Sequence, residues 1–403
     1  MKQEIYLDNS ATTKTADEVA ELMMKIMTRD YGNPSSLHNK GIEAERYIRC
    51  AGDTLSEILK CDKGEIYYTS GGTESDNWAI LAGAHANRRR GKRLITTAIE
   101  HPAVAEPMKE LTREGFEVIT LPVDGQGFVQ LQALEEALNE ETILVSVMLV
   151  NNEVGSIQPV SEIGKLIRQK HPGTLFHTDA VQGFGRLEIN PAKMGIDLLS
   201  VSGHKLHGPK GTGFLYVSKN AKLTPYLYGG GQQKNMRSGT ENVPGIAGLA
   251  RAAELAYANL SADTDRLYEL KDYLIAELKK LPDVRINGPI GEEADKAQSK
   301  QVAMDGAIRR DAPHIVNASF LGIRSEVLLH SLEEHGIYVS AGSACSSHKQ
   351  TGSATLRAMG VDKPAMESAL RFSFSTYTTK QELEQTLEVI SELMPKLRRF
   401  TRR

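Results

Sequence analysis

The chain has 403 residues, which is more than a single hydrophobic core usually holds, so one large domain with a smaller partner is expected. A composition of 40% hydrophobic and 25% charged residues is typical of a globular protein and argues against disorder. The net charge is -3, with 48 basic against 51 acidic residues, so no overall field favours nucleic acid or an anionic membrane, and small molecules or proteins are the expected partners.

The N-terminus and the cysteines narrow the setting further. The opening MKQEIYLDNSATTK contains no apolar run of signal-peptide length, and no later stretch approaches the roughly 18 consecutive apolar residues of a membrane span. A cytoplasmic protein is therefore expected. Cys50, Cys61 and Cys345 form no CxxC pair and no cluster with histidine at metal-ligand spacing, so we expect neither a disulfide framework nor a metal site. Any cysteine chemistry is that of a single thiol.

Seven apolar runs typical of buried strands alternate with amphipathic segments. The runs span 65–70, 93–100, 117–123, 142–150, 174–179, 197–202 and 213–218. The helix candidates span 18–28, 42–59, 104–114, 131–138 and 160–169. Runs without polar alternation, separated by segments of crossover length, indicate an α/β fold with a mostly parallel seven-stranded sheet and helices on both faces.

The pattern changes after the glycine-rich stretch 229–239. A long helix is expected over roughly 247–273 and beyond, followed by short strands around 283–286 and 314–320. The polar segment 291–312 is expected to be an exposed insertion. We therefore expect a large α/β domain over 13–262 and a small α+β domain formed by 1–12 and 263–403.

The string TSGGTESDN (69–77) follows a predicted strand and opens a helix. The backbone N-H groups of Gly71, Gly72 and Thr73 would then be free to bind an anion. A tight turn with Thr73 as the helix cap explains the string equally well. Because it lacks the GK[ST] ending of a P-loop and the GxGxxG of a dinucleotide site, nucleotide binding is disfavoured.

The string SVSGHKLHGPKGTGFLYV (200–217) places Ser202, His204 and Lys205 at a strand end, in a glycine-rich loop. A partly desolvated lysine has a lowered amine pKa, as a Schiff-base lysine requires. A solvated loop lysine is the alternative, and Lys210 is a rival. The adjacent His204, a candidate phosphate donor, favours Lys205.

In HTDAVQ (177–182), Asp179 ends a predicted strand and is expected to point into the crevice at the carboxyl edge of the sheet. A buried carboxylate requires a partner, and a capping or salt-bridged aspartate would satisfy this need. A protonated pyridine nitrogen would also satisfy it, since the ion pair keeps the ring able to accept electrons. An anion cradle, this aspartate and Lys205 together predict a pyridoxal 5'-phosphate site.

Ten motifs follow one another along nearly the whole chain. They are YLDNSATT (6–13), GNPSSLH (32–38), TSGGTESDN, EHPAV (100–104), VNNEVG (150–155), TDAVQ, SGHKLHGPKG (202–211), RSGTEN (237–242), GSACSS (342–347) and RFSFS (371–375). In these motifs the chain resembles the class V, fold type I pyridoxal-phosphate enzymes, and within them the cysteine desulfurases of the iron-sulfur and nitrogen-fixation type. The resemblance implies conversion of L-cysteine to L-alanine, with the sulfur passing to an enzyme cysteine as a persulfide. A protein acceptor for iron-sulfur cluster assembly or tRNA thiolation would then receive it.

The resemblance also assigns cofactor contacts. They fall on Gly72, Thr73, His101, Asn152, Asp179, Gln182, Ser202, His204, Lys205 and Thr240. Lys205 would hold the cofactor, His101 would stack on the pyridine ring and assist proton transfer, and Gln182 would reach the phenolic oxygen. Taken alone, His101 before a proline is more typical of a loop or cap. Thr240 would reach the phosphate from the neighbouring subunit, which implies a homodimer with shared active sites.

Arg371 matches the arginine that holds the substrate α-carboxylate, a task that suits a bidentate guanidinium. Asn152 and Asn33 match residues near the same carboxylate, and each fits a turn equally well.

Cys345 is the candidate sulfur-receiving thiol. It lies in AGSACSSHKQTGSAT (341–355), a stretch of small and polar residues that is expected to be a mobile loop of the small domain. Cys50 and Cys61 fall in or beside an amphipathic helix, where buried structural thiols are expected. Only a thiol on a mobile loop can attack the substrate sulfur and then reach an acceptor.

Several alternatives stay open. A class V aminotransferase or a lyase such as kynureninase needs the cofactor residues but no loop cysteine. A selenocysteine lyase acts on a substrate of the same geometry. A non-catalytic sulfur-trafficking scaffold would keep only the fold, and the intact set of Lys205, Asp179, His101, Arg371 and Cys345 argues against it.

Overall fold

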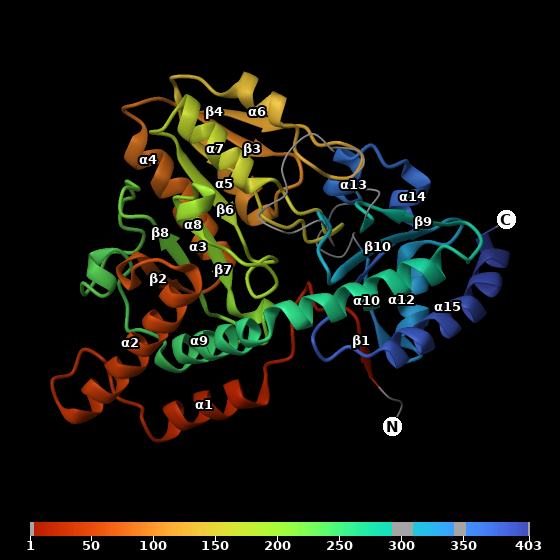
Figure 1. The fold of residues 1–403 in the computed structure, drawn as a ribbon, viewed down its shortest axis with the longest axis horizontal. Coiled ribbons are helices and arrows are strands. Elements are labelled where there is room, and N and C mark those ends of the chain that lie inside the picture. The colour runs from red at the N-terminus through yellow and green to blue at the C-terminus, as the bar shows by residue number, and fades with distance from the viewer. Residues whose placement is uncertain (1–3, 292–308, 342–351, 402–403) are drawn as a thin grey trace.

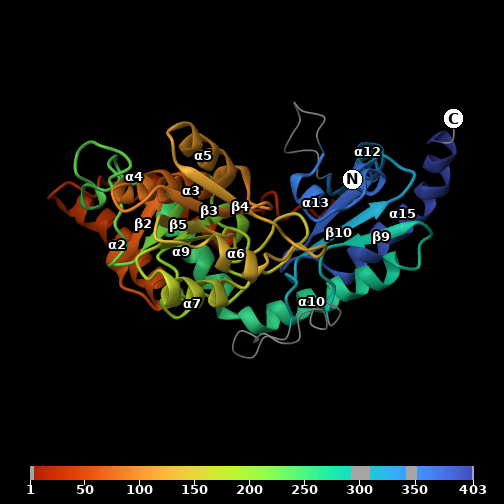
Figure 2. The same ribbon diagram turned by 90° about the horizontal axis from the view of Figure 1, so that it is seen from above.

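The computed structural model describes residues 4–291, 309–341 and 352–401. Cys345 and most of the predicted insertion 291–312 lie outside the described residues. The described chain forms two parts that lie side by side, with helix α10 (Leu260–Leu278) along one edge (Figures 1 and 2). The first part contains a seven-stranded sheet, and the second contains a four-stranded sheet.

The large sheet has the order β2-β8-β7-β6-β5-β3-β4. Its strands are β2 (Ile66–Thr69), β3 (Arg93–Thr97), β4 (Glu117–Leu121), β5 (Thr142–Ser146), β6 (Leu175–Asp179), β7 (Leu198–Ser202) and β8 (Gly213–Val217). From β7 to β4 every neighbouring pair is parallel, whereas β8 is antiparallel to both β7 and β2. The predicted mostly parallel seven-stranded sheet is confirmed.

Helices cover both faces of this sheet. They are α1 (Asp17–Thr28), α2 (Asn39–Leu59), α3 (Gly72–Asn77), α4 (Gly83–Asn87), α5 (Pro102–Arg113), α6 (Leu131–Ala137), α7 (Val160–Lys170), α8 (Pro191–Met194) and α9 (Val243–Ala258). A π-helical turn (Trp78–Ala82) joins α3 to α4. Successive strand residues point to opposite faces, so Leu144 packs in the cluster of Trp78 and α5, while Val145 packs with α2, α7 and α9.

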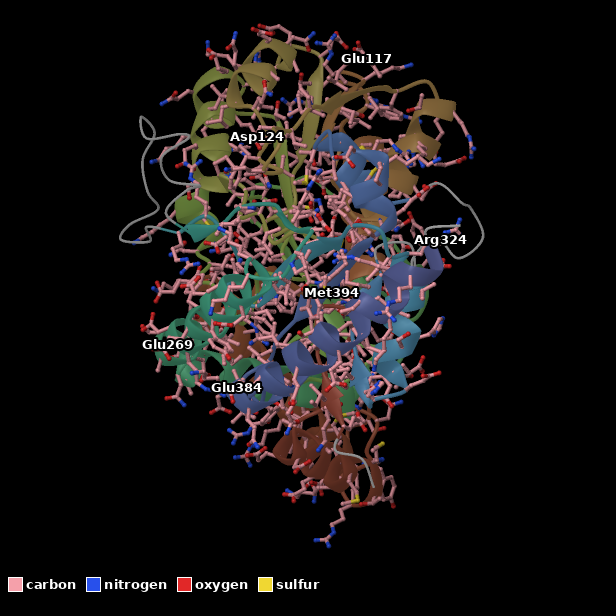
Figure 3. All side chains as sticks on the ribbon, turned by 90° about the vertical axis from the view of Figure 1, so that its right-hand side faces the viewer. Glu117, Asp124, Glu269, Arg324, Glu384 and Met394 are labelled. Atoms are coloured by element: carbon pink, nitrogen blue, oxygen red, sulfur yellow. The ribbon has the colours of Figure 1, made fainter. Side chains whose placement is uncertain are left out.

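The second part is built on an antiparallel sheet of order β12-β13-β10-β9. Its strands are β9 (Val284–Asn287), β10 (Ile315–Phe320), β12 (Ser340–Ala341) and β13 (Ala369–Ser373), and its helices are α10, α12 (Ser325–Glu333), α13 (Ala354–Ala358), α14 (Lys363–Glu367) and α15 (Lys380–Thr401). Figure 3 looks onto this part, where Met394 of α15 packs into the core. No described helix is long and apolar enough to cross a bilayer.

The N-terminal strand belongs to the second part. β1 (Ile5–Tyr6), which Figure 1 shows beside the second part, pairs in parallel with β11 (Ile337–Tyr338). Ile5 and Leu7 are buried in the second core. A separate apolar cluster joins the two parts. Its members are Ile99, Val123, Met148 and Val154 from the first part with Leu356, Met359 and Ala369 from the second.

The helix expected over 247–273 is two helices, α9 and α10, which meet at Asn259. Asn259 has φ -127 and ψ 28, outside the helical region. Asparagine is a poor residue for a helix interior because its side chain competes for backbone hydrogen bonds. The prediction of one helix was therefore wrong.

A buried ion cluster lies where the chain re-enters the described part after residue 308. Lys271 of α10 and Asp311 are 1% and 0% exposed and are 2.8 Å apart. Arg309 binds Asp311 at 2.9 Å and also binds Asp272. The N-H of Ala312 donates to the carbonyl of Gly155, so the cluster connects α10 with the first part.

Candidate active site

Four of the predicted cofactor residues lie at the carboxyl ends of the parallel strands β3, β6 and β7, where α/β sheets commonly bind ligands. Asp179 is the last residue of β6, and Ser202 is the last of β7. Lys205 closes the short helical turn that follows β7 (Gly203–Lys205). His101 is the N-cap of α5, which follows β3.

Lys205 is half-buried, whereas its rival Lys210 is exposed. The Lys205 Nζ donates hydrogen bonds to the carbonyls of Ser10 at 2.5 Å and Ala11 at 2.7 Å. The amide of Gln182 donates to the same Ser10 carbonyl at 2.9 Å. Lys205 and Gln182 therefore converge on one backbone atom.

Asp179 is buried, and its Oδ1 accepts the N-H of Val181 at 2.9 Å. Burial, followed by the neighbouring Asp76 carboxyl, raises the pKa of Asp179 to about 7. Burial lowers the pKa of His101, which the charge of Asp179 opposes and that of Lys205 reinforces. The three groups are thus close enough to influence one another.

The Nδ1 of His101 accepts the N-H of Ala103 at 3.1 Å, so the capping role considered from the sequence is observed. In the neutral imidazole the proton then lies on Nε2. The Nε2 proton is therefore the one that the neutral His101 ring can donate.

The glycine-rich loop before α3 lies against the ends of β6 and β7. Gly71 has φ +146, a conformation that side chains rarely adopt. A Cβ on Gly72 would stand 2.7 Å from a methyl of Val181 and 3.7 Å from Cβ of Ser202. Thr73 is exposed in the first turn of the helix. Gly72 and Ser202 are therefore brought together as the resemblance implies.

His204 is half-buried, and its ring is 3.1 Å from the Thr12 hydroxyl. Burial, followed by the charges of Lys205 and Lys210, lowers its pKa to about 4. The imidazole is therefore neutral at physiological pH and can act as a hydrogen-bond donor or acceptor.

Arg371 lies on β13 with its side chain 8% exposed. Its Nη1 donates to the Asn152 carbonyl at 2.9 Å, so Asn152 reaches it through the backbone. Its Nη2 binds the Asp8 carboxylate at 2.7 Å. Its Nε is buried and has no hydrogen-bond partner among the described residues.

Two predicted residues are not brought into this group within one chain. Asn33 is exposed, and its Oδ1 accepts the N-H of Ser35 at 2.9 Å, which is the turn role weighed from the sequence. Thr240 is also exposed. In the described part of the chain neither side chain hydrogen-bonds to Lys205 or Arg371.

Cys345 lies outside the described residues, but one described flank of its segment pairs with Arg371 and the other binds the residue next to Asn152. Ser340 of β12 pairs with Arg371 in the sheet. On the other side, the Ser353 hydroxyl donates to Glu153 at 2.5 Å, next to Asn152.

The expectation of buried thiols at the other two cysteines was wrong for Cys50, which is exposed on α2. Cys61 is half-buried, and burial followed by the charges of Glu65 and Asp62 raises its pKa to about 12. Hydrophobic periodicity indicated a helix here but did not fix which face Cys50 occupies.

The sequence reasoning also missed the role of the N-terminal segment Asp8–Thr13. Besides the contacts of Asp8, Ser10 and Ala11, its Thr13 donates to the carbonyl of His204 at 2.9 Å. The available signal was the polar string DNSATT directly after a short apolar strand.

The residues present fit pyridoxal phosphate. Asp179 has a single hydrogen bond and no cation in contact among the described residues, so its ionised form lacks the partner that a protonated pyridine nitrogen would supply. Lys205 is within electrostatic reach of His101 on the same sheet edge. No three His, Cys, Asp or Glu side chains of the described residues form a metal-binding group.

Residues 5–386 match the model of the aminotransferase class-V family, and the chain belongs to this family. It is therefore a fold type I enzyme that depends on pyridoxal phosphate, as the resemblance predicted.

Its relatives narrow the class further. The chain is 40% identical to the cysteine desulfurase IscS of Clostridium botulinum (strain Hall) over 402 residues, covering 100% of this chain and 97% of the relative. It is 43% identical to the cysteine desulfurase IscS of Methanosarcina thermophila, covering 98% and 93%. Among solved structures, a NifS-like protein superposes with a TM-score of 0.89 at 38% identity, covering 98% of this chain and 100% of that one. A structure of SspA in complex with cysteine superposes with a TM-score of 0.77 at 30% identity, covering 94% of this chain and 100% of that one.

Proposed function

We propose that this chain is a cysteine desulfurase that converts L-cysteine to L-alanine and carries the sulfur as a persulfide on Cys345. Full-length similarity to cysteine desulfurases supports the reaction. One structural observation supports the assignment of the thiol. On one side of the segment that contains Cys345, Ser340 pairs with Arg371, the candidate carboxylate-binding residue; on the other side, Ser353 binds Glu153, which follows Asn152, a hydrogen-bond partner of Arg371.

In this proposal different residues of the site bind different parts of the cofactor. Lys205 would hold it through the amine, Asp179 would partner the pyridine nitrogen, and His101 would stack on the ring. Gln182 would reach the phenolic oxygen. The phosphate would be bound by Gly72, Thr73, Ser202 and His204, joined in the dimer by Thr240. When bound, pyridoxal phosphate supplies an electron sink for the substrate α-carbon.

The substrate would be oriented by its carboxylate on Arg371, with Asn152 beside it. The amine of Lys205, once free, would take the α-proton, and His101 would assist. The Cys345 thiolate would form a bond to the substrate sulfur as the carbon-sulfur bond breaks. The electron pair of that bond stays on the carbon side, which is then protonated to give alanine.

A homodimer is part of this proposal and rests on the distribution of exposed apolar side chains. Among the described residues, eight of the eleven large apolar side chains that are exposed lie in 24–42 and 226–228. The second stretch pairs with the strand-like run before Thr240, since Leu227 bridges Arg237. A surface of this kind commonly marks a protein interface, and it would place Thr240 next to a partner's site.

The proposal also keeps the division into a large domain over 13–262 and a small domain over 1–12 and 263–403. Support comes from the separate hydrophobic cores of the two sheets and from the burial of Ile5 and Leu7 in the second core. A location in the cytoplasm fits the free thiols of Cys50 and Cys61.

Replacement of the proposed acceptor thiol tests the reaction. Cys345→Ala should retain the visible absorbance of the bound cofactor but lose at least about 100-fold in cysteine-dependent alanine and sulfide formation, since loss of a nucleophile costs far more than loss of a supporting group. Cys50→Ala, which removes the exposed thiol on α2, is the matched control and should behave as wild type. Mass spectrometry of the enzyme after one turnover should find the added sulfur on the peptide that contains residue 345.

Retained turnover in Cys345→Ala, or sulfur found on Cys50, would contradict the assignment. The acceptor is identified separately, by capturing proteins from the native host on the persulfidated enzyme. An iron-sulfur scaffold and a tRNA-thiolation enzyme are the two outcomes compared.

A further inference from the structure

The guanidinium of Arg371 is held on its two terminal nitrogens and left unpartnered on the third. Nη1 donates to the Asn152 carbonyl at 2.9 Å, and Nη2 donates to Asp8 at 2.7 Å. Nε is buried without a partner among the described residues. A buried donor left without a hydrogen bond is unfavourable, and a ligand that accepts from it would remove this cost.

Asp8 is fixed by the backbone around it. It forms a bridge with Ser373, two residues beyond Arg371 on β13, so both β13 side chains point to the same face. The Ser373 N-H donates to the Leu7 carbonyl at 2.7 Å, and the Ser373 hydroxyl accepts the N-H of Ser10 at 2.8 Å. The Asp8 carboxylate is 21% exposed, so it is not sealed in the core.

We propose that Asp8 is the positioning residue of the substrate-carboxylate site: it holds the Arg371 guanidinium by Nη2 so that its unpartnered Nε edge receives the carboxylate of L-cysteine. The inference rests on the proposed role of Arg371. A long arginine side chain loses rotamer freedom when it is ordered, and the contacts of both terminal nitrogens remove that freedom before the substrate binds. Asp8 also leaves the site nearly neutral, which disfavours ligands with more than one negative charge.

The experiment compares Asp8→Ala, which removes the anchor, with Asp8→Asn, which keeps an acceptor oxygen. The probes are L-cysteine, cysteamine, which has the same amine and thiol but no carboxylate, and L-alanine. The dissociation constant of L-alanine is measured from the absorbance change of the cofactor-loaded enzyme, a readout that needs no turnover.

Asp8→Ala should raise the KM for L-cysteine and the dissociation constant of L-alanine about 10- to 100-fold, the effect of one charge-assisted hydrogen bond, with kcat changed less than about 3-fold. Asp8→Asn should recover most of this loss. The KM and kcat measured with cysteamine, which has no carboxylate, should not change in either variant. Glu367→Ala, which removes a negative charge from the exposed pair with Lys363, should resemble wild type.

Three results would overturn the inference: an unchanged dissociation constant for L-alanine, tighter binding of L-alanine, or an equal loss with cysteamine. Tighter binding would mean that Asp8 occupies the place of the substrate carboxylate. Arg371→Ala separates this inference from the proposed function. If Arg371→Ala weakens L-alanine binding and Asp8→Ala does not, only the role of Asp8 fails; if neither does, the carboxylate assignment of Arg371 fails as well.

Discussion

At the scale of single residues, Glu100 is a buried carboxyl next to His101 that the site keeps uncharged. It precedes His101, and its Oε1 accepts hydrogen bonds from the Thr97 hydroxyl at 2.7 Å and from the Met148 N-H at 3.0 Å. Its Oε2 is buried without a hydrogen bond among the described residues. Burial raises the pKa of Glu100 to about 8, and the nearby Asp179 contributes in the same direction. The carboxyl is therefore protonated at neutral pH.

This protonation predicts a pH-dependent stability. Between about 4.5 and about 8 the unfolded chain has lost the proton that the folded chain keeps, so the contribution of Glu100 to stability falls as pH rises through that window. Glu100→Gln cannot ionise and should escape the loss. Between the acid and the alkaline end of this window, the free energy of unfolding of Glu100→Gln should rise by about 2–4 kcal/mol relative to that of wild type. Denaturant unfolding of the cofactor-free proteins measures this difference.

Glu106→Gln is the control, since Glu106 is an exposed residue of α5 that pairs with Lys109. It should follow the wild-type curve. If the free energy of unfolding depends on pH in the same way for wild type and Glu100→Gln, ionisation of the buried Glu100 carboxyl does not destabilise the fold as predicted.

The site residues that could be predicted from the sequence are those whose position depends on a neighbouring apolar run. Asp179 is the last residue of a buried strand and Lys205 follows one, so their place at the sheet edge could be inferred from these apolar runs. Asp8 could not be assigned, because its partner Arg371 is 363 residues away. Cys50 was misplaced because the apolar pattern of α2 did not resolve which face its thiol occupies.

At the scale of elements, all seven strands of the large sheet were predicted because each is a short apolar run, and all but the edge strand β4 are largely buried. The antiparallel direction of β8 was not assigned. The connection from Ser202 to Gly213 was the missed signal, since it is too short for the dozen or more residues that a parallel crossover usually needs. The division of α9 from α10 at Asn259 was missed because both helices keep an apolar pattern across it.

The ion cluster between α10 and the 309–312 segment predicts an uneven response to mutation. Asp311→Ala would leave the buried Lys271 with the Ala312 carbonyl at 2.7 Å as its remaining partner in the described chain. An uncompensated buried charge costs about 3–5 kcal/mol, so the free energy of unfolding, measured in denaturant, should fall by this amount. Asp272→Ala breaks only the exposed contact to Arg309 and should cost less than about 1 kcal/mol. Equal losses in the two variants would contradict the central role of the buried pair.

At the scale of the whole molecule, the exposed apolar side chains of the first part predict how copies associate. Met27 and Ile42 are both 56% exposed and lie on α1 and α2, at the end of the molecule opposite α15 (Figure 1). The double variant Met27→Glu with Ile42→Glu should shift a dimer toward monomer, because an interface must then bury two carboxylates. Light scattering coupled to size exclusion measures the change.

Val327→Glu is the matched control, since Val327 is 45% exposed on α12 in the second part. It should leave the association state unchanged. If both variants dissociate, or neither does, the interface does not lie on the surface formed by 24–42.

The placement of the N-terminal segment has a consequence for biosynthesis. Asp8 is translated before Arg371, the arginine that it binds, which follows 363 residues later in the sequence. At about 5–20 residues per second, the segment waits roughly 20–70 s before that partner has been translated. Strands of the large sheet can assemble during this interval, while the segment around Asp8 stays available to chaperones. The ion pair between Asp8 and Arg371 therefore forms late, only after translation has passed β13.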